Sequence, residues 1–202
     1  MPDGYEGEGQ DVDDDLDLSG VKALRLFPLP GVVLFPHAVL PLHIFEERYK
    51  AMTEDALASD RLVTVVMLRP EAEWKGKGSP RYEEYGCVGR ILKYERLEDG
   101  KFNFLLLGLR RVRLTREVPS GSMYRASEFE AIEDLAIDGE ELEAQEAELI
   151  RLFRGFLEPH GGIDPHLEEI LSSPLPAGAL ADILSHALPI PVEMKQGLLA
   201  ER

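Results

Sequence analysis

The side chains in this sequence best suited to nucleophilic or acid–base chemistry are one thiol and two imidazoles. Cys87 is the single cysteine, and His37 and His43 lie six residues apart on either side of Pro41. A catalytic thiol needs a neighbouring base such as histidine to activate it, and no histidine lies near Cys87 in the sequence. We predict that Cys87 is a small buried residue and that both histidines have ordinary polar or packing roles. A small hydrolase built on these three residues is kept as an alternative function.

The same residue types argue against a metal ion or another cofactor. A single cysteine excludes an intrachain disulfide and zinc sites built from several cysteines. The five histidines never pair at the spacing of metal ligands on a helix. Asp11, Asp13 and Asp15 resemble the start of a calcium loop, but Leu16 and Lys22 stand where that loop requires glycine and glutamate. We therefore predict no catalytic residue, no metal and no cofactor.

A cluster of arginines raises a nucleic-acid alternative. Arg110, Arg111, Arg113 and Arg116 fall within seven residues of strand-like sequence. Alternation along a strand places Arg111 and Arg113 on one face, with apolar residues on the other. No aromatic residues alternate with these arginines, and the protein is strongly anionic, which opposes phosphate binding. The sequence therefore favours a solvated strand face, with an RNA-binding module as the alternative.

Large apolar side chains near turns and prolines are candidates for binding a polypeptide. Trp74 is the single tryptophan and lies in a polar loop over residues 69–84. Large aromatic side chains dominate recognition surfaces, and proline withholds backbone donors at a sheet edge. The predicted polypeptide-binding residues are Phe35, His37, Leu40, Trp74 and Tyr82.

Charge and hydropathy limit the partners and the compartment. The 202 residues include 22 basic and 38 acidic side chains, a net charge of −16, and 44% are hydrophobic. Residues 1–20 carry eight acidic side chains and no basic one, so we predict a disordered acidic tail there. Such acidity disfavours nucleic acids and anionic membrane surfaces. No apolar run reaches 18 residues, the first residues do not resemble a secretory signal, and one cysteine suits the reducing cytoplasm.

Residues 21–135 have the texture of a compact β-rich unit with one helix. Asp99-Gly100 predicts a type I′ hairpin, and Gly108 predicts a bulge in the returning strand. Residues 62–68 are almost wholly apolar and β-branched, which is typical of a strand buried on both faces. The predicted strands are 24–27, 40–45, 62–68, 85–96, 102–114 and 123–132, with a helix from residue 46 to about 59.

Residues 136–202 change to helical periodicity. Leu142, Leu149, Phe153 and Phe156 recur at spacings of seven, four and three, which indicates one stripe of a long helix. Shorter helical patterns follow at 164–172, 177–188 and from 193 to the end. We predict a small helical subdomain here, and the sequence leaves the oligomeric state open.

Several ordered motifs match one known family. They lie in the segment LFPLPGVVLFPHAVLPLHIFEERYKAM at 26–52, in 86–91 and 107–112, and in 181–184 and 195–199. Together these stretches resemble the amino-terminal, substrate-binding domain of the ATP-dependent Lon protease, in its free-standing bacterial form. His37 departs from the pattern, since a small turn-forming residue is expected there.

The resemblance implies an α+β fold, in which a PUA-like, mainly antiparallel β pseudo-barrel with one helix precedes a small helical subdomain. It also implies a non-enzymatic module that binds unfolded or partner polypeptides, because this region of Lon helps to recognise and hold protein substrates. No G-x-x-x-x-G-K-[ST] phosphate loop occurs, and 202 residues leave no room for the proteolytic domain.

Overall fold

The computed structural model describes residues 16–70, 80–133, 140–160, 162–173 and 175–201. Its strands are β1 (Leu24–Leu29), β2 (Val39–Ile44), β3 (Leu62–Leu68), β4 (Tyr82–Arg96), β5 (Phe102–Val118) and β6 (Arg125–Ala131). Its helices are α1 (Glu47–Leu57), α3 (Glu140–Leu157), the short 3-10 turn η1 (Glu158–His160), α4 (Pro165–Leu171), α5 (Ala177–Ala187) and α6 (Val192–Ala200).

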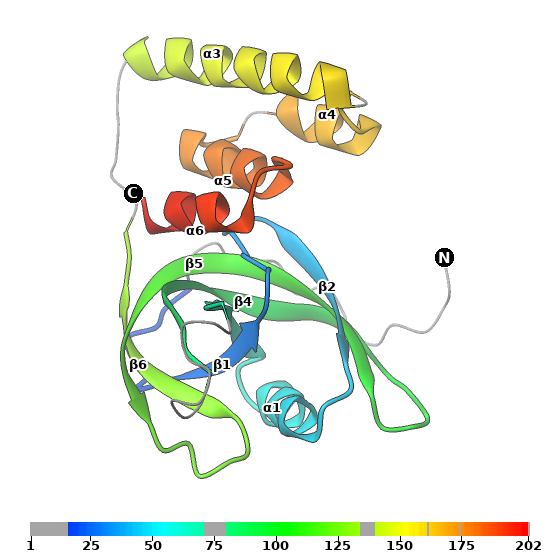
Figure 1. Cartoon of the computed structure of the whole chain (residues 1–202), viewed down its shortest axis with the longest axis vertical. Helices are drawn as coiled ribbons and strands as arrows, with labels where there is room; N and C mark the ends of the chain where they lie inside the picture. Colours follow the sequence, from blue (N-terminus) through cyan, green and yellow to red (C-terminus); the bar gives the residue numbers. More distant parts are fainter. Residues whose placement is uncertain (1–15, 71–79, 134–139, 161, 174, 202) are drawn as a thin grey trace.

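The six strands form one sheet that closes into a barrel (Figure 1). Their order is β2-β5-β4-β3-β1-β6, and β6 pairs again with β5, which completes the ring. The 17-residue β5 makes this closure possible, because its first half pairs with β2 and its second half with β6. Within the described strands β1 and β3 alone are parallel neighbours. The predicted α+β fold with a mainly antiparallel pseudo-barrel is confirmed.

Two apolar clusters lie on opposite sides of the sheet. The inner cluster draws on β1, β3, β4, β5 and β6, so it fills the closed ring; its buried members include Leu26, Val88 and Val112. The outer cluster lies between the sheet and the elements that cover it, α1, α6 and the segment before β2. Leu199 of α6 is buried in this outer cluster, so the last helix packs on the outside of the barrel as well as belonging to the helical region.

The predicted bulge at Gly108 is confirmed, and it allows two segments to approach closely. Pairing between β4 and β5 shifts register here, because Gly89 faces Gly108 and Val88 faces Arg110. The Gly108 backbone N–H donates to the Ala38 carbonyl. A β-carbon on Gly108 would lie 2.0 Å from the Phe35 carbonyl oxygen, so glycine is required by the space available.

Two predicted local features differ from the structure. The Asp99-Gly100 hairpin is not a type I′ turn, because Gly100 alone of the pair has positive φ, at 76°. Leu97 accepts from the Gly100 N–H and donates to the Lys101 carbonyl, the pattern of a three-residue loop ending in a left-handed glycine. The acidic tail was predicted to extend to residue 20, but Leu16 and Leu18 are buried in the inner cluster. Residues 1–15 lie outside the described part of the chain.

The helical region has its own small core. Phe153 and Leu157 of α3 pack with Leu171 of α4 and with Leu180 and Leu184 of α5. The predicted long helix is thus confirmed, with Phe153 facing inward, whereas Leu149 and Phe156 are exposed. Figure 1 shows α3 at the end of the molecule farthest from the barrel, with α6 beside the sheet. None of the described helices is long and apolar enough to span a bilayer.

Replacing Gly108 with alanine should destabilise the protein. The new methyl group would collide with the backbone of residue 35, which cannot move without shifting the outer cluster. We expect the free energy of unfolding to fall by roughly 2–4 kcal/mol in urea titrations. Gly197→Ala is the matched control, because nothing lies within 4 Å of its added carbon. That helical control should keep or raise stability, by up to about 1 kcal/mol. Equal effects of the two variants would refute the steric explanation.

Candidate functional site

Cys87 and the two histidines do not form a catalytic group. Cys87 is fully buried in the outer cluster, and its thiol donates to the Val88 carbonyl rather than to a histidine. Burial, followed by the nearby charge of Asp182, raises the pKa of Cys87 to about 12, so the thiol is protonated at neutral pH. His43 lies on the exposed face of β2, where its Nδ1 is 2.7 Å from the Asn103 amide oxygen. The geometry gives the hydrolase alternative no support.

His37 has a structural role that its residue type obscures. It adopts a left-handed backbone conformation with φ of 61°, in the turn that leads into β2. Its backbone N–H donates to the Gly108 carbonyl over 2.8 Å, which holds this turn against the bulge. The turn therefore requires the conformation that a small residue adopts most easily, and the imidazole adopts it at some cost.

Carboxylates already neutralise most of the arginine cluster on β5. Arg113 pairs with Glu84 at 3.0 Å and with Glu130 at 2.6 Å. Arg116 pairs with Glu128 at 2.5 Å. These contacts agree with a solvated strand face for these two residues, and they reduce the positive charge available to phosphates.

Arg111 does not belong to that solvated face. Its guanidinium makes a two-pronged ion pair with Asp182 of α5, and one of the two contacts is 3.1 Å long. The side chains are 11% and 1% exposed, so this pair links the barrel to the helical region in a largely dry setting. Nearby, the Gln196 amide donates to the Tyr85 carbonyl and Lys195 donates to the His186 carbonyl. The Arg111 and Gln196 contacts therefore join α5 and α6 to the barrel, and the Lys195 contact joins these two helices to each other.

Among the predicted polypeptide-binding residues that the structure describes, Phe35, Leu40 and Tyr82 do not share one exposed surface. Phe35 is fully buried, so the prediction that it contacts a partner is wrong: its ring fills the outer cluster beside His186, 6.3 Å away. Leu40 packs against the outer cluster and Tyr82 against the inner one, where the Arg125 guanidinium covers its ring. Trp74 lies outside the described residues.

Another apolar surface lies along β2. Val39 is 45% exposed and Phe45 is 59% exposed, and His43 stacks on Phe45 with ring centres 6.1 Å apart. Val39, Pro41 and His43 alternate along β2 and share its exposed face, and Phe45 continues the alternation at the residue directly after the strand. We call Val39, Pro41, His43 and Phe45 the edge-strand surface. The sequence carried a signal for it: proline at position 41 marks an edge strand, and the odd positions 39–45 then fall on one face.

The free edge of β2 carries backbone groups as well as side chains. Among the described strands β2 pairs with β5 alone. The Gly108 N–H donates to Ala38, so alternation in an antiparallel ladder directs residues 40, 42 and 44 toward β5. Val39, Pro41 and His43 therefore direct their backbone groups to the open side. Because Pro41 has no N–H, this edge presents two donors and three acceptors over these residues.

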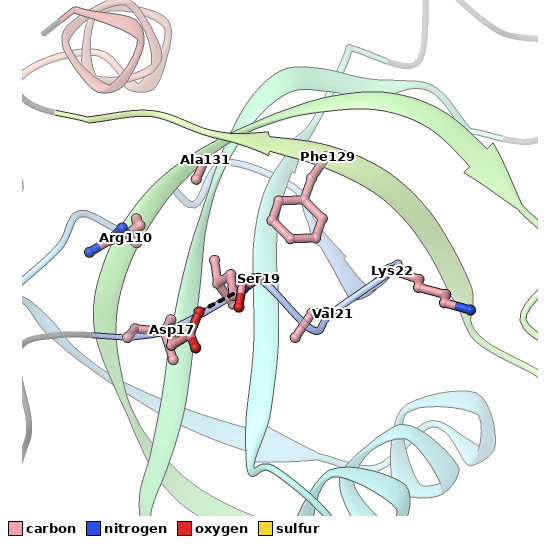
Figure 2. Close-up of a pocket in the computed structure, with 9 residues that line it drawn as sticks. Asp17, Ser19, Val21, Lys22, Arg110, Phe129 and Ala131 are labelled. Carbon is pink, nitrogen blue, oxygen red and sulfur yellow. Dashed lines mark hydrogen bonds between the residues drawn. The ribbon is translucent and has the colours of Figure 1, made fainter.

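Two cavities lie elsewhere on the barrel. The larger, about 630 Å³, is found where residues 16–22 cross the sheet; Figure 2 shows Asp17 and Arg110 on one side of it and Lys22 on the other. Ser19 donates its backbone N–H to Asp17, which lowers the pKa of that carboxyl. The second, about 450 Å³, includes Tyr82 and Arg113. Among the described residues no three His, Cys, Asp or Glu side chains gather as metal ligands do.

The Arg111–Asp182 pair gives a stability test. Asp182→Asn would leave a buried guanidinium without its counter-charge, so the free energy of unfolding should fall by about 3–5 kcal/mol. Arg111→Met combined with Asp182→Leu removes both charges and should recover most of that loss. Glu128→Gln, in an exposed pair, is the matched control and should change stability by less than about 1 kcal/mol. Urea unfolding measures all three; a loss in Asp182→Asn no larger than the control's would show that the pair does not join the two parts.

Comparison with known proteins identifies relatives over most of the chain. The family model for the ATP-dependent protease La (LON) substrate-binding domain matches residues 23–202. The Lon protease of Anaeromyxobacter dehalogenans is 29% identical over 177 residues, which cover 87% of this chain and 21% of that protein. The Lon protease of Escherichia coli K12 is 29% identical over 176 residues, covering 87% of this chain and 22% of that protein. The chain therefore spans about a fifth of the length of these relatives.

Solved structures agree with this assignment. The N-terminal domain of the Mycobacterium avium complex Lon protease superposes with a TM-score of 0.68 at 19% identity, over 88% of this chain and 89% of that one. A Lon N-terminal domain protein from Xanthomonas campestris gives a TM-score of 0.63 at 23% identity, over 90% and 91% of the two chains. At these identities the likeness establishes the fold, while the family model establishes descent. This chain belongs to the family of Lon substrate-binding domains.

Proposed function

We propose that this chain is a non-enzymatic module that binds extended polypeptide segments along the free edge of β2. The observation that carries the proposal is the edge-strand surface, where exposed apolar side chains of β2 and of Phe45 directly after it lie beside outward backbone groups. Family membership supports a polypeptide as the ligand, since the matching family is defined as a substrate-binding domain. The matched part is about a fifth of each Lon protease, which supports a binding role without catalysis.

An extended polypeptide fits the chemistry of this edge. A strand added beside β2 would pair with the N–H groups of Val39 and His43 and with the outward carbonyls. Its alternate side chains would lie against Val39 and Phe45, which supply apolar contact. Pro41 withholds one donor in the middle of the edge, so pairing is short and reversible rather than a route to aggregation.

The side-chain part of this proposal is tested with reduced, carboxymethylated α-lactalbumin, an unfolded probe, by fluorescence anisotropy. Phe45→Ser should weaken binding about tenfold or more, because the lost apolar contact corresponds to roughly 1.5–3 kcal/mol. Met123→Ser is the matched control, since Met123 is 64% exposed in the connection between β5 and β6. The control should bind as the unmodified protein does. Equal affinity for Phe45→Ser and the unmodified protein would reject this surface.

A second pair of variants isolates the backbone contribution. His43→Pro removes an outward N–H without breaking the ladder to β5, because position 43 does not donate to that strand. His43→Ala removes the imidazole but keeps the N–H. If a strand is added at this edge, His43→Pro should bind the probe several-fold more weakly than His43→Ala. Identical affinities would show that any binding is by side chains alone.

A further inference from the structure

His186 is a titratable residue at the contact between the helical region and the barrel. It lies near the end of α5, and Figure 1 shows α5 between α3 and the barrel. Its ring stands edge to face with Phe35 of the outer cluster, with 6.3 Å between the ring centres. Lys195 of α6 donates its ammonium to the His186 backbone carbonyl. Two helices and the barrel therefore meet at this one residue.

One nitrogen of this imidazole suits the neutral ring alone. His186 Nδ1 is closed to solvent and has no hydrogen-bond partner among the described residues. A neutral ring can leave Nδ1 unprotonated, as an unused acceptor. The imidazolium carries an N–H on both ring nitrogens, so protonation would bury a donor without an acceptor. Gln196 Oε1 of α6 is also buried without a partner in the described part of the chain, so polar groups on this side of α6 are incompletely satisfied.

The charges around the ring also oppose a second proton. Lys195 of α6 brings a positive charge to it. Asp182 lies one helical turn before His186 on α5, but Arg111 of β5 already pairs with that carboxylate. Cys87 of β4 is a protonated thiol and carries no charge. The described neighbours therefore offer the imidazolium no unpaired negative charge.

Burial and this cation act in the same direction on the titration of the ring. Burial first, and then the Lys195 ammonium, lowers the pKa of His186 from its ordinary 6.5. A contact with the Val33 backbone partly offsets this effect. The segment before β2 meets the ring through Val33 and Phe35, which carry no charge. The ring is thus neutral at neutral pH while α5 lies against the barrel.

A ring that resists protonation only while α5 is in place makes this contact sensitive to acid. When α5 moves away, water surrounds the imidazole and its pKa returns to the ordinary value. The open form then binds the proton more tightly than the closed form. The closed form keeps its full stability above about pH 6.5 and loses it as the pH falls from there toward the lowered pKa of His186.

We propose that protonation of His186 shifts α5 from this closed position to an open one, so that the protein contains a pH-sensitive contact between its barrel and its helical region. The Arg111–Asp182 pair opposes the opening, which keeps the open form a minority at neutral pH. Cys87 lies beneath the same contact, because the charges of Asp182 and Arg111 both act on its buried thiol. As the single cysteine of the chain, it reports the opening through its reactivity. The edge-strand surface takes no part in this device.

Labelling of Cys87 with dithiodipyridine, a disulfide reagent that reacts with thiols even at acid pH, tests the proposal. Dividing each rate by that of N-acetylcysteine removes the pH dependence of the thiol itself. From about pH 7.5 to about pH 5.5 the corrected rate should rise about fivefold or more, because the open form takes up a proton over this range. At the lower pH, about 1 M urea should leave the rate nearly unchanged, since a local opening exposes little surface.

Variants of the histidine separate its titration from other effects of acid. His186→Gln and His186→Phe both place an uncharged side chain there, and either should abolish the rise. His43→Gln is the matched control, because His43 is exposed on β2, and it should keep the rise. Far-ultraviolet circular dichroism identifies the variants that fold. A corrected rate independent of pH in the unmodified protein, a rise that persists in a folded His186 variant, or a rate that climbs steeply with urea would each overturn the proposal. The first and third outcomes need no variant.

Discussion

The extra residue that β5 carries at Gly108 is the constraint on which the other contacts depend. Before the bulge, even-numbered side chains such as Phe104 and Leu106 face the outer cluster; after it, Val112 and Leu114 face the inner cluster. One strand can therefore serve both sides of the sheet. The same change of face directs Arg111 outward to Asp182 rather than into the barrel, where a lone guanidinium would have no counter-charge. The bulge thereby places Arg111 where it can pair with Asp182 and hold α5 against the barrel.

Much of the barrel could be predicted from sequence because its signals are local. Alternation and β-branched runs located the strands, and a glycine within a strand indicated the bulge. Other features depend on contacts between distant segments. Leu16 and Leu18 lie in an acidic stretch whose composition predicts a disordered tail. In the structure they are buried in the inner cluster of the barrel. The turn at Gly100 was misassigned because several hairpin turns accept Asp-Gly, and strand register selects among them.

The candidate site was less predictable than the fold. Phe35 and Phe45 are both aromatic residues near prolines, but Phe35 is fully buried and Phe45 is 59% exposed. The difference between them is that Phe35 points toward the outer cluster and Phe45 points away from it. The spacing of residues in the sequence does not show which side of β2 faces the cluster, because that depends on which strand β2 pairs with. Arg111 and Arg113 differ in the same way. The sequence places both on one face of β5, yet Arg111 forms a buried ion pair with Asp182 and Arg113 forms an exposed one with Glu130.

The pairing of distant segments sets the order in which the protein can fold during synthesis. β1 finds its parallel neighbour β3 about forty residues later, but its other edge stays open until β6 emerges, with Leu24 facing Ser127. The outer cluster is completed later still, because it includes Leu199. A growing chain therefore displays an unsatisfied strand edge and an incomplete core for most of its synthesis, a state in which nascent polypeptides recruit chaperones or aggregate. The outer cluster contains Phe27 of β1 and Leu199 of α6, so it can be completed only after α6 has been synthesised. Contacts between such distant segments form slowly, and we therefore expect this cluster to assemble late in folding.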